Sequence, residues 1–277
     1  MKFGLLGATL GHSLSPQIHK MVFEELGLNH TYELLELQEA EVLPFLSRAA
    51  EEYGGFNVTI PYKVKVMEAL KTSSLEAKAI GAVNTILFRK GEGYGYNTDY
   101  FGFSRMLDFN KISVTDKRVV LLGNGGAAKA VLQYLLNEGA GSIKIVARSV
   151  EGAKEKLVAF MDRGEDLEVI SQEDFRKNTG GDIIINTTPV GMAPHMAASP
   201  VEAQELEGYE AAVDLIYNPE ETLFLRQAKL RGCQTCNGMY MLVAQAIASE
   251  EIWLERKLPD SLIAKIAAAM QDSLCKI

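Results

Sequence analysis

The sequence predicts an α/β protein with two domains, each built on an open, mostly parallel sheet covered by helices. Two observations lead to this fold class. Short apolar runs alternate with helix-length amphipathic segments, and a second series of these alternations begins near Lys117. A length of 277 residues also suits two domains of ordinary size. We therefore expect a first domain over residues 1–101, a second over 102–237, and helices over 238–277.

The elements of the first domain follow in chain order from its apolar runs. The run after Lys2 is short and apolar, as in a buried strand. Pro16 then stands after Ser15 at a favoured first helical position. Further short apolar runs alternate with amphipathic spacing. Strands are expected over residues 2–6, 31–35, 55–58 and 85–88, and helices over 16–26, 39–50 and 63–70.

The second series of elements begins with an apolar strand before a glycine-rich turn. Strands are expected over residues 118–122, 142–146, 167–170, 182–186 and 211–216, and helices over 126–137, 150–161 and 221–231. A loop is expected over 189–208, because Pro, Gly, Ala and Ser occur there with little periodicity. The chain ends with two predicted helices, over 239–255 and 261–274.

Composition limits the classes of function. Hydrophobic residues make up 47% of the chain and charged residues 23%, the balance of a globular protein with a sizeable core. A net charge of −8 argues against binding to a nucleic-acid backbone, which needs a basic face. The three cysteines are too few for a disulfide scaffold, and no apolar stretch reaches the ~18 residues that cross a bilayer. We expect a cytoplasmic protein with small-molecule partners, away from membranes, as a monomer or homodimer.

The glycine-rich turn after residue 122 has the G-x-G-x-x-A pattern of dinucleotide-binding sites. Gly123 permits the tight turn, Gly125 lets the backbone approach a pyrophosphate, and Ala128 allows close packing of the helix on the sheet. The helix N-terminus offers unpaired N–H groups to the same anion. The second domain is therefore predicted to be a Rossmann-type domain, the alternative being a plain βα turn. The predicted pyrophosphate site comprises Gly123, Asn124, Gly125, Gly126, Ala127 and Ala128.

The end of the next strand bears on the choice of cofactor. A NAD site usually has Asp or Glu there, whereas this chain has Arg148 and Ser149, with Lys154 one helical turn further. A guanidinium can bind a 2′-phosphate bidentately and stack on adenine. The sequence thus favours NADP over NAD, although Glu151 lies close by. The alternative is that Arg148 and Lys154 are solvated surface residues.

Four segments of the first domain carry polar residues that a packed core would not select. They are His12–Pro16, Asn57–Lys63, Gly81–Thr85 and Asn97–Asp99. Because the ends of parallel strands meet at one crevice, we expect these segments to lie close together. The spacing of the histidines indicates no metal site, and Cys233-x-x-Cys236 is interpreted as a coincidence.

The side chains in these segments suit a polyhydroxylated small molecule, because each buried hydroxyl of such a ligand needs a hydrogen-bond partner. Lys63 and Asp99 would supply a proton donor and its charged partner. Each residue also has a simpler interpretation: Ser15 can cap a helix, and Lys63 can be an exposed lysine. The expected uncharged donors and acceptors are Ser13, Ser15, Thr59, Asn84 and Asn97.

Taken together, these segments resemble the shikimate dehydrogenase family along most of the chain. The ordered set is far more specific than any one motif. One departure concerns the cofactor: the family often has Asn-Arg-Thr or Asn-Arg-Ser where this chain has Ala147-Arg148-Ser149, and a second arginine usual there is absent. The resemblance is carried by residues 11–19, 57–63, 81–85, 97–99, 123–130, 186–192, 214–219 and 237–246.

The resemblance implies an NADP-dependent oxidoreductase that interconverts 3-dehydroshikimate and shikimate on the route to chorismate and aromatic amino acids. It implies Lys63 and Asp99 as the catalytic pair, no metal, and C-terminal helices that return to the first domain. Gly238 and Met239 would lie by the nicotinamide. The implied loop near the nicotinamide includes Thr187 and Thr188, and the implied shikimate contacts are Ser13, Ser15, Thr59, Asn84, Asp99, Gln245 and, nearby, Tyr217.

Three alternatives stay open at this point. The nearest is a quinate/shikimate dehydrogenase that uses NAD, which the residues from Ala147 to Lys154 would distinguish. A regulatory protein that binds the cofactor without catalysis is disfavoured by Lys63 and Asp99. Two-domain enzymes similar to glutamyl-tRNA reductase or methylene-tetrahydrofolate dehydrogenase share a related cofactor domain, but the serine and lysine motifs fit them poorly.

Overall fold

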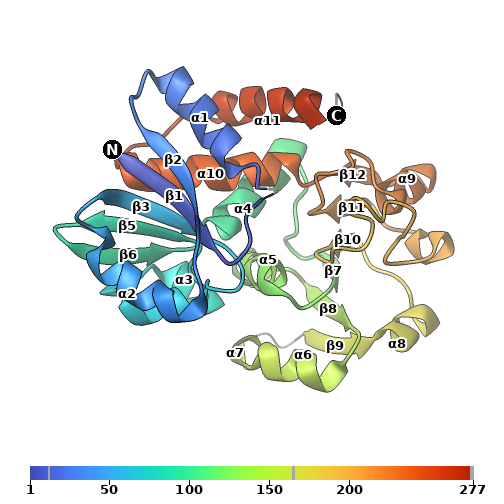
Figure 1. Cartoon of the computed structure of the whole chain (residues 1–277). Coiled ribbons are helices and arrows are strands. Elements are labelled where there is room, and N and C mark those ends of the chain that lie inside the picture. Colours follow the sequence, from blue (N-terminus) through green and yellow to red (C-terminus); the bar gives the residue numbers. More distant parts are fainter. Residues whose placement is uncertain (12, 164–165, 275–277) are drawn as a thin grey trace. The chain divides into compact units, whose positions relative to one another are not determined.

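The computed structural model describes residues 1–11, 13–163 and 166–274, which form two compact units (Figure 1). Unit 1 comprises Met1–Gly102 and Val243–Met270, and unit 2 comprises Phe103–Leu242 with the described residues after Met270. The three boundaries fall inside helices, in α4 (Thr98–Asn110), in α10 (Met239–Leu254) and near the end of α11 (Asp260–Leu274).

Unit 1 contains a mixed sheet with the strand order β2-β1-β3-β5-β6-β4. Strand β1 pairs in parallel with β2 and β3, whereas β5 pairs antiparallel with both β3 and β6. Parallel pairing at one side and a β5–β6 hairpin at the other bring the end of β3 next to the start of β5. The strands are β1 (Lys2–Gly7), β2 (Thr31–Glu36), β3 (Tyr53–Val58), β4 (Thr72–Ser73), β5 (Thr85–Arg89) and β6 (Glu92–Tyr96).

The helices of unit 1 bury apolar faces on this sheet, with Phe3, Leu6 and Phe56 fully buried in its core. Helix α11 lies along α1, where Lys265 pairs with Glu25 at 2.7 Å (Figure 1). The helices are α1 (Ser15–Leu26), α2 (Glu39–Ala49), the 3₁₀ helix η1 (Lys65–Ala69), α3 (Leu75–Ile80), the start of α4, most of α10, and α11 (Asp260–Leu274).

Helix α10 is anchored to the rest of unit 1 by polar and aromatic contacts. Trp253, near its end, stacks on Phe3 with ring centroids 4.4 Å apart, and its indole N–H donates to the carbonyl of Ile86 at 2.9 Å. Glu250 accepts from His19 of α1 at 2.5 Å, and both side chains are fully buried. The C-terminal part of the chain is therefore integral to the unit that contains the N-terminal sheet.

Unit 2 contains a parallel sheet with the strand order β12-β11-β10-β7-β8-β9. The reversal of order at β7 is typical of a Rossmann-type fold, as predicted, and ligands bind at such a reversal beyond the carboxyl ends of the strands. The strands are β7 (Arg118–Leu122), β8 (Ser142–Ala147), β9 (Leu167–Ser171), β10 (Ile183–Asn186), β11 (Ala211–Asp214) and β12 (Gln234–Cys236).

Several elements of the structure differ from the sequence prediction. The helix predicted over 63–70 is the short 3₁₀ helix η1, and the helix predicted over 150–161 is interrupted at Leu157, whose ψ of 11° leaves the helical range. The predicted loop over 189–208 contains the 3₁₀ helix η2 (Ala203–Leu206). The other helices of unit 2 are α5 (Gly126–Asn137), α6 (Val150–Lys156), α7 (Val158–Met161), α8 (Gln172–Lys177) and α9 (Leu223–Leu230).

Candidate active site

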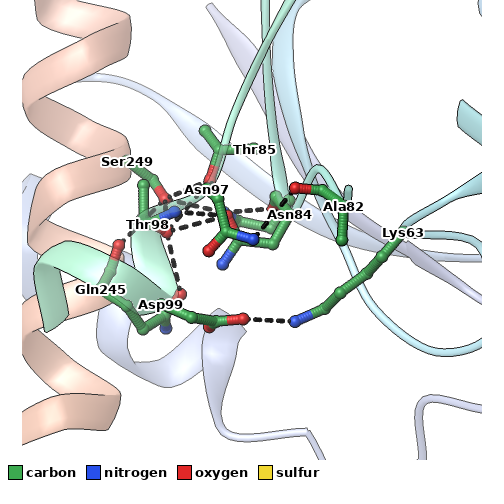
Figure 2. A network of polar contacts seen from close by, with 10 residues as sticks. Lys63, Ala82, Asn84, Thr85, Asn97, Thr98, Asp99, Gln245 and Ser249 are labelled. Atoms are coloured by element: carbon green, nitrogen blue, oxygen red, sulfur yellow. Dashed lines mark hydrogen bonds and ion pairs between the residues drawn. The ribbon is translucent and has the colours of Figure 1, made fainter. Parts of the chain in front are cut away.

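An ion pair between Lys63 and Asp99 is the central feature of the polar site in unit 1. Lys63 lies in the turn between β3 and η1, and its carbonyl accepts the N–H of Val83 at 2.8 Å, which ties this turn to the segment before β5. Asp99 is the second residue of α4. Lys63 Nζ donates to Asp99 Oδ2 at 2.6 Å, and the side chains are 22% and 16% exposed (Figure 2). The pair is thus partly shielded from water but still accessible to a ligand.

Asn84 has its side-chain amide fixed by its neighbours. Its Oδ1 accepts from the backbone N–H of Thr98 at 2.7 Å and from the hydroxyls of Thr85 and Thr98 at 3.1 and 3.2 Å. A backbone N–H can only donate, so the atom that it meets must be the oxygen. The Nδ2 group donates to no other residue in the described part of the chain. Asn84 therefore presents a hydrogen-bond donor to any ligand beside it.

The two predicted serines lie at the start of α1. The helix begins at Ser15, and its N-cap residue is Leu14, which makes no side-chain cap; the expectation that Ser15 caps this helix is wrong. Instead, Ser13 Oγ accepts from the N–H of Ser15 at 3.2 Å. Burial raises the pKa of Tyr32 well above its ordinary value, while a hydrogen bond with Ser15 opposes that rise. Both serines stay partly exposed, so their hydroxyls are accessible.

Thr59 occupies the loop directly after β3. Its N–H donates to the carbonyl of Leu6 at 2.9 Å, and its carbonyl accepts from Tyr62 at 3.0 Å. These backbone bonds continue the pairing of β3 with β1 into the turn that contains Lys63. His12, interpreted as a loop residue in the sequence, lies outside the described residues.

Gln245 comes from α10 and joins the same network, because Thr98 Oγ1 lies 3.5 Å from Gln245 Oε1 (Figure 2). The sequence did not single out three buried residues behind the site, Asn57, Thr85 and Ser249, as binding residues. Asn57 Nδ2 donates to Ser249 Oγ at 2.8 Å and to Thr85 Oγ1 at 3.1 Å. Their side chains are short and uncharged, so only the folded arrangement reveals that they meet.

The glycine turn of unit 2 has the geometry that the sequence predicts for an anion site. Gly123 has φ of +102°, a conformation that favours glycine, and a Cβ there would lie 2.9 Å from Thr187 Oγ1. A Cβ at Gly125 or Gly126 would meet nothing within 4 Å. Ala128 is buried against the sheet. The N-terminus of α5 is therefore open to a ligand, with no acidic residue in its first turn.

The cationic residues at the end of β8 are available for a phosphate. Arg148 and Lys154 are exposed, and the side chain of neither forms an ion pair or hydrogen bond within residues 1–11, 13–163 and 166–274. Ser149 is the N-cap of α6, where its hydroxyl accepts from Gly152 N–H at 3.2 Å. Glu151, which the sequence places close to both cations, forms no ion pair with the side chain of Arg148 or Lys154.

A buried polar cluster supports the loop that contains Thr187 and Thr188. Asn186 Oδ1 accepts from the N–H and the hydroxyl of Thr188 at 3.0 and 2.7 Å, and its Nδ2 donates to Asp214 Oδ1 at 3.0 Å. Asp214 Oδ2 accepts from Thr222 at 2.7 Å. Burial raises the pKa of Asp214 to about 6, although these hydrogen bonds oppose the rise. The cluster fixes the chain at the carboxyl ends of β10 and β11.

The other predicted residues of unit 2 follow β11 and β12. Tyr217 is partly buried, and burial raises the pKa of its hydroxyl. Gly238 passes so close to the chain that a Cβ would lie 2.0 Å from the carbonyl oxygen of Leu215. Met239, the first residue of α10, is buried, and its N–H donates to Asn237 Oδ1 at 3.1 Å. Glycine is therefore required at 238 for packing.

Across the described residues, no group of three or more His, Cys, Asp or Glu side chains is placed to hold a metal ion. In the same part of the chain, none of the helices has both the length and the apolar character needed to span a bilayer.

Comparison with known proteins places the chain in a family. The model of the shikimate dehydrogenase substrate binding domain matches residues 5–86, and that of shikimate / quinate 5-dehydrogenase matches residues 107–207. The shikimate dehydrogenase (NADP(+)) of Clostridium beijerinckii is 43% identical over 261 residues, covering 94% of each chain. The chain belongs to the shikimate dehydrogenase family.

Solved structures of the shikimate dehydrogenase family share the whole fold. A chorismate mutase/shikimate 5-dehydrogenase fusion protein from Clostridium acetobutylicum is 41% identical with a TM-score of 0.92, over 99% of this chain and 98% of that one. The shikimate 5-dehydrogenase of Thermus thermophilus, solved with NADP(H) and shikimate, is 32% identical with a TM-score of 0.86, over 97% and 99%. The family therefore extends over both units.

Proposed function

We propose that this protein is an NADP-dependent shikimate dehydrogenase that reversibly reduces 3-dehydroshikimate to shikimate. One observation carries the chemistry: the Lys63 ammonium lies 2.6 Å from the Asp99 carboxylate, next to the amide of Asn84. The similarity to the Clostridium beijerinckii enzyme over 94% of both chains supports the same activity. The product belongs to the route to chorismate and the aromatic amino acids.

The polar residues of unit 1 would bind the substrate. A ring with several hydroxyls and a carboxylate needs many donors and acceptors, because each polar group buried without a partner costs ~1–3 kcal/mol. Asn84 Nδ2 offers a donor, and the serine and threonine hydroxyls offer both donors and acceptors. The proposed contacts in this unit are Ser13, Ser15, Thr59, Asn84, Asp99 and Gln245. The resemblance to the family adds Tyr217.

Lys63 acts as the general acid when the ketone is reduced. When bound, NADPH supplies the hydride that reduces the ketone carbon. Negative charge then grows on the ketone oxygen, and the Lys63 ammonium donates a proton to that oxygen. Asp99 holds the ammonium in place through its 2.6 Å hydrogen bond. In the reverse direction, neutral Lys63 accepts the proton of the hydroxyl while Asp99 orients the amine.

The residues of unit 2 fit a dinucleotide phosphorylated at the adenosine ribose. The open approach at Gly125 leaves room for a pyrophosphate on the N-terminus of α5. Arg148 is an exposed guanidinium without an acidic partner in the described chain, suited to bidentate binding of a 2′-phosphate. Lys154 adds positive charge. We assign the contacts to Gly123, Asn124, Gly125, Gly126, Ala127, Ala128, Arg148, Ser149, Lys154, Thr187, Thr188, Gly238 and Met239.

We propose that one domain binds the substrate and the other binds the cofactor. The substrate domain comprises residues 1–101 with the C-terminal helices over 238–277, and the cofactor domain comprises residues 102–237. We propose a cytoplasmic enzyme that acts as a monomer or homodimer. Analytical ultracentrifugation of the purified protein distinguishes these two states.

A spectrophotometric assay tests the function. Oxidation of shikimate and of quinate is followed through the absorbance of the reduced cofactor, with NADP and NAD each supplied in turn. We expect turnover of shikimate with NADP to exceed the other three combinations. Preferred use of NAD with quinate would replace the proposal by a quinate/shikimate dehydrogenase. Tight binding of NADP without turnover of either acid would indicate a regulatory protein.

A further inference from the structure

Ser249 lies at the centre of the polar network behind the substrate residues of unit 1. Its side chain is completely buried in α10, four residues after Gln245 and therefore on the same helix face. Ser249 Oγ accepts from Asn57 Nδ2 at 2.8 Å and lies 2.9 Å from Thr85 Oγ1 and 3.3 Å from Thr98 Oγ1. It donates to the carbonyl of Gln245 at 3.0 Å. A single hydroxyl thus joins four segments (Figure 2).

Three of the four partners of Ser249 are a proposed substrate residue or its neighbour in the sequence. Thr85 follows Asn84 in sequence and donates to its Oδ1. Thr98 precedes Asp99 and donates to the same oxygen of Asn84 through its N–H. The carbonyl that accepts from Ser249 belongs to Gln245 itself. Ser249 is buried too deeply to touch a ligand, so any effect on binding must pass through these neighbours.

The hydrogen bond from Tyr32 sets the orientation of the Asn57 amide in this network. Asn57 Oδ1 accepts from Tyr32 at 2.8 Å, so both hydrogens of its Nδ2 remain for Ser249 and Thr85. The single hydroxyl hydrogens of Ser249, Thr85 and Thr98 are then shared among Asn84 Oδ1, the carbonyl of Gln245 and the contacts between these hydroxyls, where either oxygen can donate. Loss of the Ser249 hydroxyl would leave one buried N–H of Asn57 without its acceptor, and the neighbouring hydroxyls would reorient.

We infer that Ser249 is a positioning residue for substrate binding, which sets the orientation of Asn84 and Gln245 through the buried network. The inference rests on the proposed function and extends it to a residue outside the ligand-contacting set. It concerns the shikimate side only, because all four partners of Ser249 lie in unit 1 with it. The network therefore controls affinity for the polyhydroxylated acid and leaves affinity for NADP unchanged.

The test compares Ser249→Ala with Ile247→Val, a matched control that trims a fully buried residue of the same helix without touching the network. We expect Ser249→Ala to raise the KM for shikimate about tenfold, the effect of one lost buried hydrogen bond, with the KM for NADP unchanged. Ile247→Val should leave both constants unchanged. Fluorescence of Trp253, the single tryptophan of the chain, reports whether unit 1 stays folded.

Each outcome decides the inference. An unchanged KM for shikimate in folded Ser249→Ala overturns it, as does an equal rise in the KM for shikimate and for NADP. If Ser249→Ala fails to fold, Ser249→Cys takes its place, because a thiol is similar in shape but accepts hydrogen bonds weakly; the same rise is expected. Absence of shikimate turnover in the unmodified enzyme would refute the proposed function first, and with it this extension.

Discussion

The buried carboxyl of Asp214 makes the stability of unit 2 depend on pH in an unusual direction. Its pKa is raised from 3.8 to about 6, with burial as the main cause. The folded protein therefore binds this proton more tightly than the unfolded chain does. The corresponding stabilisation is fully present below pH 3.8 and is lost as the pH rises through about 6.

The size of this effect follows from the shift. A difference of about 2.2 pKa units, from 3.8 to about 6, corresponds to ~3 kcal/mol over the full range of pH. Between about pH 5 and about pH 7.5, the linkage relation predicts that the free energy of unfolding changes by ~1.4 kcal/mol because of this group. Asp214→Asn removes the titrating group at constant size, and the amide oxygen can still accept from Asn186 and Ile216.

Urea unfolding at about pH 5 and about pH 7.5 measures the effect. We expect the free energy of unfolding of the unmodified protein, relative to Asp214→Asn, to fall by ~1.4 kcal/mol between these two pH values. Asp182→Asn is the matched control in the same unit, because a hydrogen bond from Arg118 lowers the pKa of Asp182 below 3.8 and it does not titrate in this window. If the free energies of unfolding of the unmodified protein and of Asp214→Asn differ by the same amount at both pH values, within ~0.3 kcal/mol, the reasoning is refuted.

Three further outcomes are expected from the described geometry. Lys63→Met should lower kcat by ~10²- to 10⁴-fold in steady-state assays, since the general acid is removed, and near-normal turnover would exclude that role. Arg148→Ala should raise the KM for NADP by ~10- to 100-fold, because only NADP carries the 2′-phosphate. The KM for NAD should stay almost unchanged, and equal changes in the two KM values would contradict the assignment. Gly238→Ala places a Cβ 2.0 Å from the carbonyl oxygen of Leu215, so urea unfolding should show a loss of ~1–3 kcal/mol, whereas an unchanged midpoint would show that the chain relaxes freely there.

The sequence predicted the fold class and most of the parallel strands, because buried parallel strands are read directly from short apolar runs. It missed β6, where Gly93 and Gly95 weaken the strand signal. The structure explains both glycines by packing: a Cβ would lie 2.8 Å from Leu70 at the first, and 2.6 Å from Leu70 and Val83 at the second. Contacts over such sequence distances are invisible to local patterns.

The candidate site was predictable in part. Lys63 and Asp99 were expected in one cluster, and the structure brings their charged atoms together. Their catalytic roles stay predictions. The capping role expected for Ser15 was wrong, because α1 begins one residue earlier than the Pro16 signal indicated. Ser249 could not be found from sequence, because a serine within an apolar helix carries no local sign of the four segments that it joins.

The fixed amide of Asn84 has a consequence for the design of inhibitors. Its oxygen is already engaged by three donors, one of which is the backbone N–H of Thr98. That N–H cannot accept a hydrogen bond, so a flip of the side chain to suit a different ligand would set two donors against each other. Analogues that place a carbonyl, an ether oxygen or a fluorine against it should be tolerated. Analogues with an ammonium at that point would place one donor against another, the Nδ2 group of Asn84, and should bind weakly.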